Sequence, residues 1–379
     1  MNPLSILFVD QYRDVAGGQI VLQALVKNAR EKGFEVGVLA PMGGGLEDAL
    51  VSSWGSSVEL HNLKQLDLQD GRKGLRDLLR LIAYCFYVLG FWKLASRYKV
   101  IYVNGCRVAP AFLLLSLLLP WHRWFYHMHL CHSRIEKMIF ALISLSPSTH
   151  QIVMASSYIR DDFFRSLPRL KHSKRFVLLE NCLGPAFAGL LPLDRFQDDR
   201  QALTVALIGR VSPEKGHDVL PRLARRFPSV RFLIIGRTLP EHQGFLDSLL
   251  ADKLPNLIYL GATSELPKLL EEQHVQFSIV PSRWEEPFGL TSIESMAASC
   301  ITLVAHKGML PSIAERTGAL CFDDDDQLER LLGRFFTLDS LSLRLLARSQ
   351  YEGVQTNFDV NTFCWKFISL IRATPLARA

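Results

Sequence analysis

The sequence predicts an α/β protein built from two doubly wound parallel sheets. Three observations lead to this class. The chain has 379 residues, two to three times the commonest length of one domain. Short apolar runs alternate with helix-like segments, as they do when helices cover both faces of a parallel sheet. The alternation stops once, in a polar stretch near the middle of the chain, and then restarts.

The first series of elements opens with a βαβ unit. Its strand, loop, helix and second strand occupy residues 4–9, 10–18, 19–32 and 34–39. Further strands are predicted at residues 100–103, 123–127, 151–154 and 175–179. Together they predict a first domain of residues 1–184.

The second series repeats the pattern. Its strands are predicted at residues 203–208, 231–235, 257–260, 277–280 and 301–304. They predict a second domain of residues 203–360. Residues 185–202 have weak periodicity and a polar, acidic end, so we expect a linker there.

Composition excludes several classes. Hydrophobic residues make up 49% and charged residues 21% of the chain, which excludes collagen-like, coiled-coil and disordered proteins. The seven cysteines are an odd number without a C-x-x-C pair, which favours a cytosolic protein over a disulfide framework. The first apolar run is short and ends at Asp10, so we expect no secretory signal.

The positive charge lies in the first half. Residues 1–190 carry 22 Lys and Arg against 14 Asp and Glu, a net +8, and the remainder carries 21 against 23, a net −2. This half also holds two very apolar segments, residues 75–95 and 108–121, which are too short to cross a bilayer. They are either buried core helices or interfacial helices resting on anionic lipid.

The most informative segment is P-S-R-W-E-E-P-F-G-L-T-S-I-E-S-M-A-A at residues 281–298. Pro287 and Gly289 prevent a continuous helix, so Glu286 is expected in a loop and Glu294 in the first turn of a helix. Backbone amides at the helix start would suit a diphosphate. The alternative is a capping box formed by Thr291 and Glu294 without any ligand.

A second segment, G-R-V-S-P-E-K-G-H-D, follows the strand at residues 203–208. Ligands of doubly wound domains bind outside the carboxyl ends of the strands, and Arg210 and Lys215 would suit a pyrophosphate there. Alternatively, Ser212 caps a helix and the two cations are solvated.

A pair of glycines, Gly17 and Gly18, follows the first strand. Glycine is required where a side chain would block a ligand from the backbone. The alternative is an ordinary strand-to-helix turn.

In order and separation, these segments resemble glycosyltransferase family 4, a retaining, nucleotide-sugar-dependent family with the GT-B fold. The resemblance implies two doubly wound Rossmann-like domains facing a central cleft. It covers both halves of the chain and implies that the last segment, residues 361–379, is a helix that crosses back to the first domain.

The resemblance also implies residue roles. Arg210 and Lys215 match the family's G-R-x-x-x-x-K-G and would bind the donor diphosphate. Glu286 and Glu294 match its two glutamates, which would contact the donor sugar and the ribose. The donor-binding set is completed by the phosphate-binding amides and their neighbours, with the glycine loop: Phe288, Gly289, Leu290, Thr291, Gly17 and Gly18.

A histidine stands near the reacting sugar in this family, and His129 is the candidate here, with His127 as its neighbour. His122 and His132 complete a cluster of four, but the strand pattern provides no carboxylate partner for a metal. The four aspartates at residues 323–326 are interpreted as a solvated helix start, not a metal site.

The predicted function is retaining transfer of a sugar from a UDP- or GDP-linked donor to a glycan or lipid-linked acceptor, in bacterial polysaccharide or glycolipid synthesis. No metal or other cofactor is expected, and no nucleic acid partner. The predicted location is cytoplasmic, with peripheral contact between the basic first domain and an anionic membrane. The sugar, base, acceptor and oligomeric state stay open.

Two rival interpretations remain. A nicotinamide-dependent enzyme would need G-x-G-x-x-G after the first strand, and residues 10–18 lack that spacing. A catalytically silent scaffold with the same fold would be expected to lose Arg210, Lys215 or Glu286, and all three are present.

Overall fold

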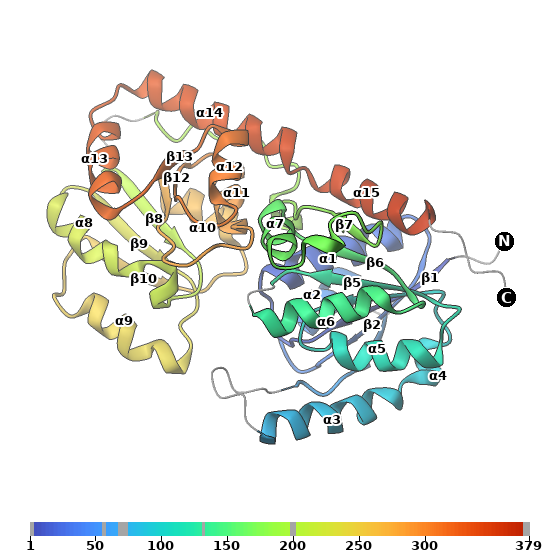
Figure 1. Ribbon diagram of the computed structural model, residues 1–379. Helices are drawn as coiled ribbons and strands as arrows, with labels where there is room; N and C mark the ends of the chain where they lie inside the picture. Colours follow the sequence, from blue (N-terminus) through green and yellow to red (C-terminus); the bar gives the residue numbers. More distant parts are fainter. Residues whose placement is uncertain (1–3, 55–57, 67–74, 131–132, 198–201, 374–379) are drawn as a thin grey trace. The chain divides into compact units, whose positions relative to one another are not determined.

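A computed structural model describes residues 4–54, 58–66, 75–130, 133–197 and 202–373. The chain divides into two compact units (Figure 1). The N-terminal unit holds residues 1–181 together with 361–379, and the C-terminal unit holds residues 182–360.

The N-terminal unit contains a seven-stranded parallel sheet in the order β3-β2-β1-β4-β5-β6-β7. Its strands are β1 (Ser5–Asp10), β2 (Glu35–Ala40), β3 (Glu59–Asn62), β4 (Val100–Asn104), β5 (Arg123–Met128), β6 (Thr149–Met154) and β7 (Phe176–Leu178). The order reverses between β1 and β4, which is the switch point of a doubly wound sheet.

Helices cover both faces of this sheet. They are α1 (Gly17–Glu31), α2 (Gly45–Trp54), α3 (Leu75–Leu89), α4 (Trp92–Ala95), α5 (Ala109–Leu118), α6 (Arg134–Leu145), α7 (Ser157–Ser166) and α15 (Val360–Ala373). Strand alternation sorts the side chains between the faces. Leu7 and Ile101 pack in the core with Phe112 of α5, whereas Phe8 and Tyr102 contact Phe367 of α15.

The C-terminal unit contains a six-stranded parallel sheet in the order β10-β9-β8-β11-β12-β13. Its strands are β8 (Thr204–Ile208), β9 (Arg231–Ile235), β10 (Leu257–Gly261), β11 (Phe277–Val280), β12 (Ile301–Ala305) and β13 (Leu320–Phe322). Its helices are α8 (Leu220–Arg226), α9 (Gln243–Leu250), α10 (Leu266–Glu272), α11 (Leu290–Ala297), α12 (Leu310–Thr317), α13 (Asp325–Phe335) and α14 (Ser340–Asn357).

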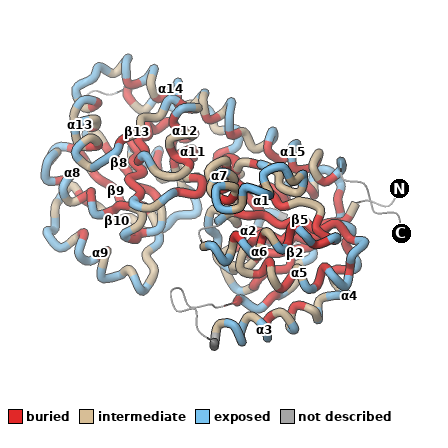
Figure 2. Tube along the Cα trace, viewed as in Figure 1, coloured by how far each residue is buried: buried red, intermediate tan, exposed pale blue. Residues whose placement is uncertain are grey.

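Buried residues follow the central strands of each unit, and exposed residues follow the outer helices (Figure 2). Strands β1, β4, β8 and β12 are buried along their whole length. Such strands appear in the sequence as continuous apolar runs, which is why they could be predicted.

Two edge strands were not predicted. β3 reads E-L-H-N and β13 has only three residues, L-C-F. An edge strand pairs on one side only and needs less apolar surface, so its sequence carries little signal.

The segment predicted as a linker, residues 185–202, packs against the C-terminal unit where the structure describes it. The backbone amide of Leu193 donates to Ser299 Oγ at 2.9 Å, and the ring of Phe196 lies edge-on to that of Phe277. Arg195 donates to the carbonyl oxygen of Ala298 at 2.7 Å. The C-terminal unit therefore begins at Cys182 and includes the predicted linker. The periodicity of a short segment does not reveal such long-range contacts.

The two very apolar segments of the first half form helices. Residues 75–95 are divided between α3 and α4, and residues 108–121 contain α5. Within the described part of the chain, no helix combines the length and apolarity that a membrane span requires.

The last helix, α15, belongs to the N-terminal unit. Arg123 of β5 is only 2% exposed and donates from Nη1 to the carbonyl oxygen of Ile371 at 2.6 Å. The last carbonyls of a helix lack intrahelical donors and carry a partial negative charge, so a buried guanidinium stabilises this end.

We expect Arg123→Ala to lower the free energy of unfolding of the N-terminal unit by about 2–4 kcal/mol, because it removes a buried charge-assisted hydrogen bond and leaves a carbonyl unpaired. The matched control is Arg160→Ala on α7, where an exposed pair with Asp161 is lost and the change should stay within about 0.5 kcal/mol. Urea unfolding followed by circular dichroism measures both. Equal effects of the two variants would contradict the assigned role of Arg123.

Candidate functional site

The two motif segments of the C-terminal unit meet at the switch point of its sheet. β8 and β11 are neighbours in the sheet, although β9 and β10 separate them in the chain. Residues 209–218 follow β8 and residues 281–289 follow β11. Both segments leave the same carboxyl edge, where doubly wound sheets bind ligands.

Glu286 lies in the loop after β11, as predicted, and is 3% exposed. Its Oε1 accepts from Lys215 Nζ at 2.7 Å, so the structure brings two of the predicted residues together. The same oxygen accepts from Ser282 Oγ at 2.5 Å and from Trp284 Nε1 at 3.0 Å. A buried carboxylate needs such donors, and here they fix its orientation.

Sequence reasoning missed Ser282 and Trp284. The ring of Trp284 also lies beneath the ammonium of Lys215, with Nζ 5.3 Å from the ring centroid. Ser282 and Trp284 stand four and two positions before Glu286, in the loop that the sequence had already indicated as a candidate site because of Glu286. The local sequence could therefore have identified both residues as donors to its carboxylate.

Two glycines in neighbouring loops allow the backbones of these loops to approach the loop that carries Glu286. Gly216 has a φ of +76°, and a Cβ there would lie 1.9 Å from the carbonyl oxygen of Pro281. A Cβ on Gly308, with a φ of +59°, would lie 2.1 Å from the carbonyl oxygen of Glu286. Any side chain at either position would displace the loop that carries Glu286.

Arg210 does not join the contact between Lys215 and Glu286. It forms an exposed ion pair with Glu214, with Nη2 and Oε1 separated by 2.7 Å. The solvated-cation interpretation thus describes Arg210 in this structure, whereas Lys215 is held within the site.

Glu294 lies on α11 and is 5% exposed. Among the described residues, no hydrogen bond offsets the burial of its carboxyl group. Burial raises the pKa of Glu294 from 4.5 to about 7. A buried carboxyl group without protein donors is the feature expected of a ligand contact.

The capping-box alternative for Glu294 is wrong. The residue that caps α11 is Gly289, with a φ of +101°, and Ser292 Oγ donates back to the carbonyl oxygen of Gly289 at 2.6 Å. Thr291 is therefore already inside the helix. The amides of Leu290 and Thr291 belong to the first turn, where a helix has no acceptors of its own.

Phe288, which was placed in the donor-binding set, is 4% exposed and packs edge-on against the ring of Phe358. Its side chain belongs to the core of the C-terminal unit.

The N-terminal unit brings the predicted glycines and histidine together at the carboxyl edge of its own sheet. Gly17 opens α1, and a Cβ on Gly18 would meet the ring of His129 at 3.4 Å. His129 Nε2 contacts Asn104 Oδ1 at 2.7 Å, and Asn104 Nδ2 donates to Asp10 Oδ2 at 2.7 Å.

This network fixes the protonation of His129. Because the amide nitrogen of Asn104 faces Asp10, its oxygen accepts and His129 donates through Nε2. Burial lowers the pKa of His129 to about 4 and raises the pKa of Asp10 to about 6. Asp10 Oδ1 also accepts from Gln19 Nε2 at 2.8 Å, which ties the network to α1. Asp10 and Asn104, each the last residue of its strand, were missed by sequence reasoning.

The structure distinguishes the two adjacent histidines. His127 is completely buried, and its Nδ1 contacts the hydroxyl of Tyr102 at 2.8 Å, whereas His129 is only partly buried. His122 contacts the carbonyl oxygen of Ser96, and His132 lies outside the described residues. No group of three metal-ligating side chains occurs in the described part of the chain.

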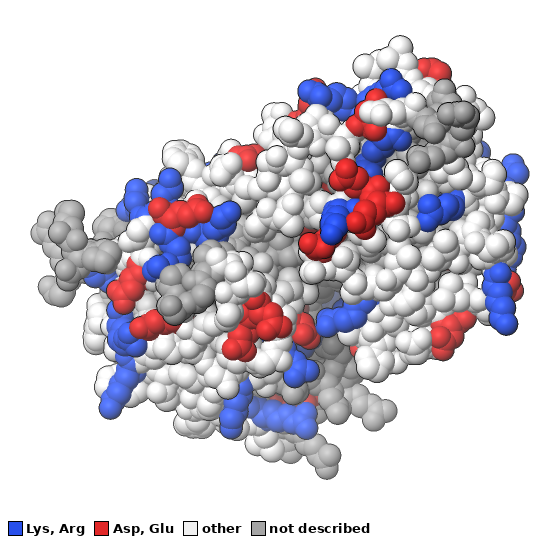
Figure 3. Space-filling model, turned by 180° about the vertical axis from the view of Figure 1, so that it is seen from behind, with Lys and Arg blue, Asp and Glu red and all other residues white. Residues whose placement is uncertain are grey.

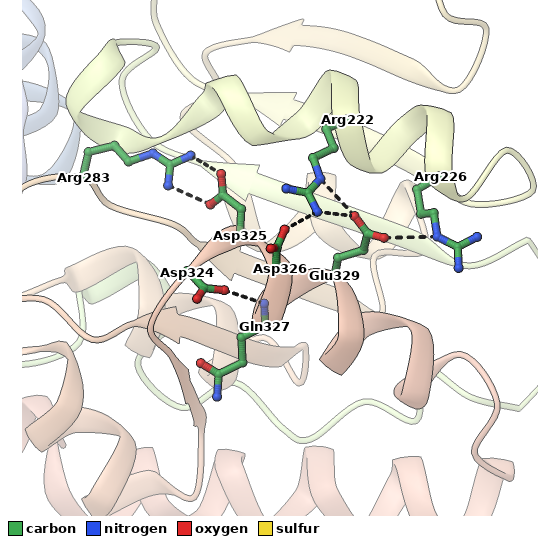
Figure 4. Close-up of polar contacts among 8 residues, drawn as sticks. All are labelled: Arg222, Arg226, Arg283, Asp324, Asp325, Asp326, Gln327 and Glu329. Atoms are coloured by element: carbon green, nitrogen blue, oxygen red, sulfur yellow. Dashed lines mark hydrogen bonds and ion pairs between the residues drawn. The ribbon is translucent and has the colours of Figure 1, made fainter.

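The acidic run forms the start of α13 (Figure 4). Asp324 caps the helix by accepting from the backbone amide of Gln327 at 2.7 Å. Asp325 pairs with Arg283, and Asp326 pairs with Arg222. The cap at Asp324 agrees with the predicted helix start.

Charges of both signs are interspersed on the face drawn in Figure 3, and broad areas of that face carry no charge. The excess of positive charge in the first half of the sequence therefore does not form one continuous basic region on this face.

Comparison with known proteins identifies the C-terminal part of the chain. Residues 195–348 match the family described as "Glycosyl transferases group 1", and the two segments that follow β8 and β11 lie inside this range. A D-inositol 3-phosphate glycosyltransferase of Mycobacteroides abscessus is 36% identical over 125 residues, which are 31% of this chain and 28% of that protein. A phosphatidyl-myo-inositol mannosyltransferase of Mycobacterium tuberculosis is 32% identical over 119 residues, 30% of each chain.

The matched segments thus span under a third of these relatives. Over the whole chain the likeness is structural. The crystal structure of Anabaena HepE in complex with UDP and glucose aligns with a TM-score of 0.78 at 17% identity, covering 98% of this chain and 100% of HepE. The predicted resemblance to a glycosyltransferase and the predicted GT-B fold, with two Rossmann-like domains, are confirmed.

The raised pKa of Glu294 predicts a pH-dependent stability. The carboxyl group titrates near 4.5 when exposed and near 7 in the folded unit, so folding is penalised wherever it is ionised. The penalty is absent below about pH 4.5, grows as the pH rises to 7 and then stays constant, on the order of 3 kcal/mol. We expect Glu294→Gln to melt at a higher temperature than the wild type at pH 8, by a margin that shrinks toward pH 5.

Thermal unfolding at pH 5, 6, 7 and 8 measures this margin. The matched control is Glu271→Gln, which changes an exposed carboxylate of α10 in the same unit. A margin that does not change with pH, or a Glu294→Gln variant less stable than the wild type at pH 8, would contradict the burial of an ionisable, unpaired Glu294.

Proposed function

We propose that the chain is a retaining glycosyltransferase that transfers a sugar from a nucleotide diphosphate donor, of UDP or GDP type, to a glycan or lipid-linked acceptor. The observation that carries the proposal is the pair of buried glutamates at the carboxyl edge of the C-terminal sheet. Glu286 is fully oriented by Lys215 and its neighbours, whereas Glu294 lacks a protein donor. Sugar hydroxyls are donors of the kind that Glu294 lacks.

The diphosphate would lie at the start of α11. The backbone amides there and the ammonium of Lys215 would stabilise the charge that develops as the sugar–phosphate bond breaks. Arg210 would join them by exchanging its exposed pair with Glu214 for the phosphate. No metal is required in this proposal, because these groups supply the positive charge.

We infer retention of configuration from the resemblance to glycosyltransferase family 4. No carboxylate is assigned as a nucleophile in this proposal. The same-face reaction expected of the family would therefore proceed without a glycosyl–enzyme bond. The anomeric configuration of the product, measured by NMR, tests this part, and an inverted product would refute it.

His129 receives a supporting role on the acceptor side. Its Nε2 is engaged by Asn104 and its pKa lies near 4, so it is neutral and holds its proton. We propose that its ring shapes the glycine loop at Gly18, over which the acceptor and the donor phosphate approach the backbone.

We expect one nucleotide diphosphate, tested with UDP-, GDP-, ADP- and CMP-linked compounds, to raise the melting temperature of the wild type. A ligand at 100 times its Kd stabilises the folded protein by about 2.7 kcal/mol. Glu294→Ala should lose the shift, and Glu271→Ala should keep it. A shift with NAD(P) alone would favour a nicotinamide enzyme, and no shift with any compound would contradict the donor site.

An exposed apolar surface on the N-terminal unit supports a lipid-linked acceptor. Helix α3 packs against α5, and α5 contacts α6. Each contributes apolar side chains that are more than 40% exposed, and Trp92 and Trp121 add two more. On the three helices these side chains are Leu78, Leu79, Ile82, Phe86, Leu114, Leu117, Leu118, Ile135, Met138, Leu142 and Leu145.

We propose that this apolar surface rests on an anionic bilayer, at the cytoplasmic face of the membrane. Helix α5 carries no charged residue, whereas the neighbouring helices contribute cations at Arg80, Lys93 and Arg134. Apolar side chains, tryptophans and nearby cations are the combination that binds the interface of an anionic membrane.

We expect the wild type to sediment with phosphatidylglycerol-containing vesicles at low salt and less at high salt. The triple variant Phe86→Ser, Leu117→Ser, Leu142→Ser should stay in the supernatant, because it removes one exposed apolar side chain from each helix. The control variant Leu341→Ser, Leu345→Ser changes equally exposed residues of α14 and should still sediment. Wild type that stays in the supernatant, or a triple variant that sediments like the control, would refute membrane contact.

A further inference from the structure

One arginine joins the loop that carries Glu286 to two other parts of the C-terminal unit. Arg283 lies in the loop after β11, and its guanidinium reaches Asp325 at the start of α13 (Figure 4). We propose that Arg283 is a positioning residue, which locks the loop of residues 281–288 in place and thereby fixes Glu286 for the donor.

The contacts of Arg283 form a fork. Nη1 and Nη2 donate to the two carboxylate oxygens of Asp325, at 2.7 and 2.8 Å. Nη2 also donates to Asp218 at 2.9 Å, and the backbone amide of Arg283 donates to the carbonyl oxygen of Glu214 at 2.8 Å. Arg283 thus ties its loop both to α13 and to the segment after β8 that contains Lys215.

The position of Arg283 within the loop connects this fork to Glu286. Ser282 precedes Arg283 and Trp284 follows it, and both donate to Glu286 Oε1. In the described part of the chain no hydrogen bond joins Arg283 to Glu286, and the Arg283 side chain is 37% exposed, so Arg283 acts through its neighbours. A displacement of the loop would move both donors of Glu286 at once.

Geometry, more than the energy of each ion pair, makes this contact important. An exposed ion pair contributes little to stability, but a bidentate guanidinium shared by two carboxylates restricts where the loop can lie. A displacement of about 1 Å in a reacting group can cost up to about 100-fold in rate. The predicted effect is therefore larger on turnover than on stability.

The acidic run supplies a matched control. Arg222 of α8 pairs with Asp326 and Glu329 of the same helix α13, and its side chain is exposed like that of Arg283. It does not contact the loop of residues 281–288 in any described interaction. If both arginines only stabilised α13, replacing either one with alanine would have the same effect on the loop and on turnover.

The experiment compares Arg283→Ala, Arg283→Lys and Arg222→Ala in the full chain. Hydrogen–deuterium exchange of residues 281–289 reports the loop, and kcat and KM for the donor report the site. We expect Arg283→Ala to speed exchange in the loop and to lower kcat/KM by about tenfold or more. Arg283→Lys should restore the slow exchange of the loop and the wild-type kcat/KM only in part, because an ammonium cannot form the fork. Arg222→Ala should leave loop exchange unchanged and kcat/KM within about twofold.

Unchanged loop exchange in Arg283→Ala, or an equal change in Arg222→Ala, would overturn the proposal. If Arg283→Ala fails to fold, Asp325→Asn breaks the same fork with a smaller change and is judged by the same criteria. The kinetic part rests on the proposed function. A wild type without donor turnover would refute that function, while loop exchange would still decide whether Arg283 holds the loop.

Discussion

The strand order of the C-terminal sheet is the constraint on which the candidate site depends. By placing β8 beside β11, it brings together Lys215 and Glu286, which lie 71 positions apart in the chain. Both loops start at the carboxyl ends of their strands, and glycine at position 216 lets their backbones touch. Without this adjacency, the two motifs would be unrelated charged loops. With it, they form one site whose buried carboxylate already has its donors.

The two glutamates of the candidate site differ in how their charge is stabilised, and we propose different roles for them on this ground. Glu286 is surrounded by protein donors and is therefore oriented before any ligand arrives. Glu294 is buried without such donors, which costs stability, and we propose that a ligand hydroxyl satisfies this acceptor. At the carboxyl edge of the N-terminal sheet, protein hydrogen bonds also orient a polar side chain. There Asp10 and Asn104 hold a neutral His129 beside the glycine loop.

The sequence predicted the buried strands, the two series of elements and the loop position of Glu286, because continuous apolar runs and prolines carry a strong local signal. The sequence could not predict that Lys215 is held in the site while Arg210 is solvated. Whether a cation is bound or solvated depends on the loop that carries Glu286, which is distant in the chain. The capping box at Thr291 was a reasonable local alternative, and the αL conformation of Gly289 excludes it. The edge strand β3 escaped prediction because its sequence, E-L-H-N, lacks the apolar run of a buried strand.

We propose that the start of α11 binds the donor diphosphate, with Glu294 on the ribose. A crystal structure of the chain with a bound nucleotide diphosphate tests it most directly. We expect phosphate oxygens within hydrogen-bonding distance of the amides of Leu290 and Thr291 and of Lys215 Nζ, with a ribose hydroxyl on Glu294. A nucleotide held instead at the carboxyl edge of the N-terminal sheet, or bound through the carboxylates of residues 323–326, would refute this donor site.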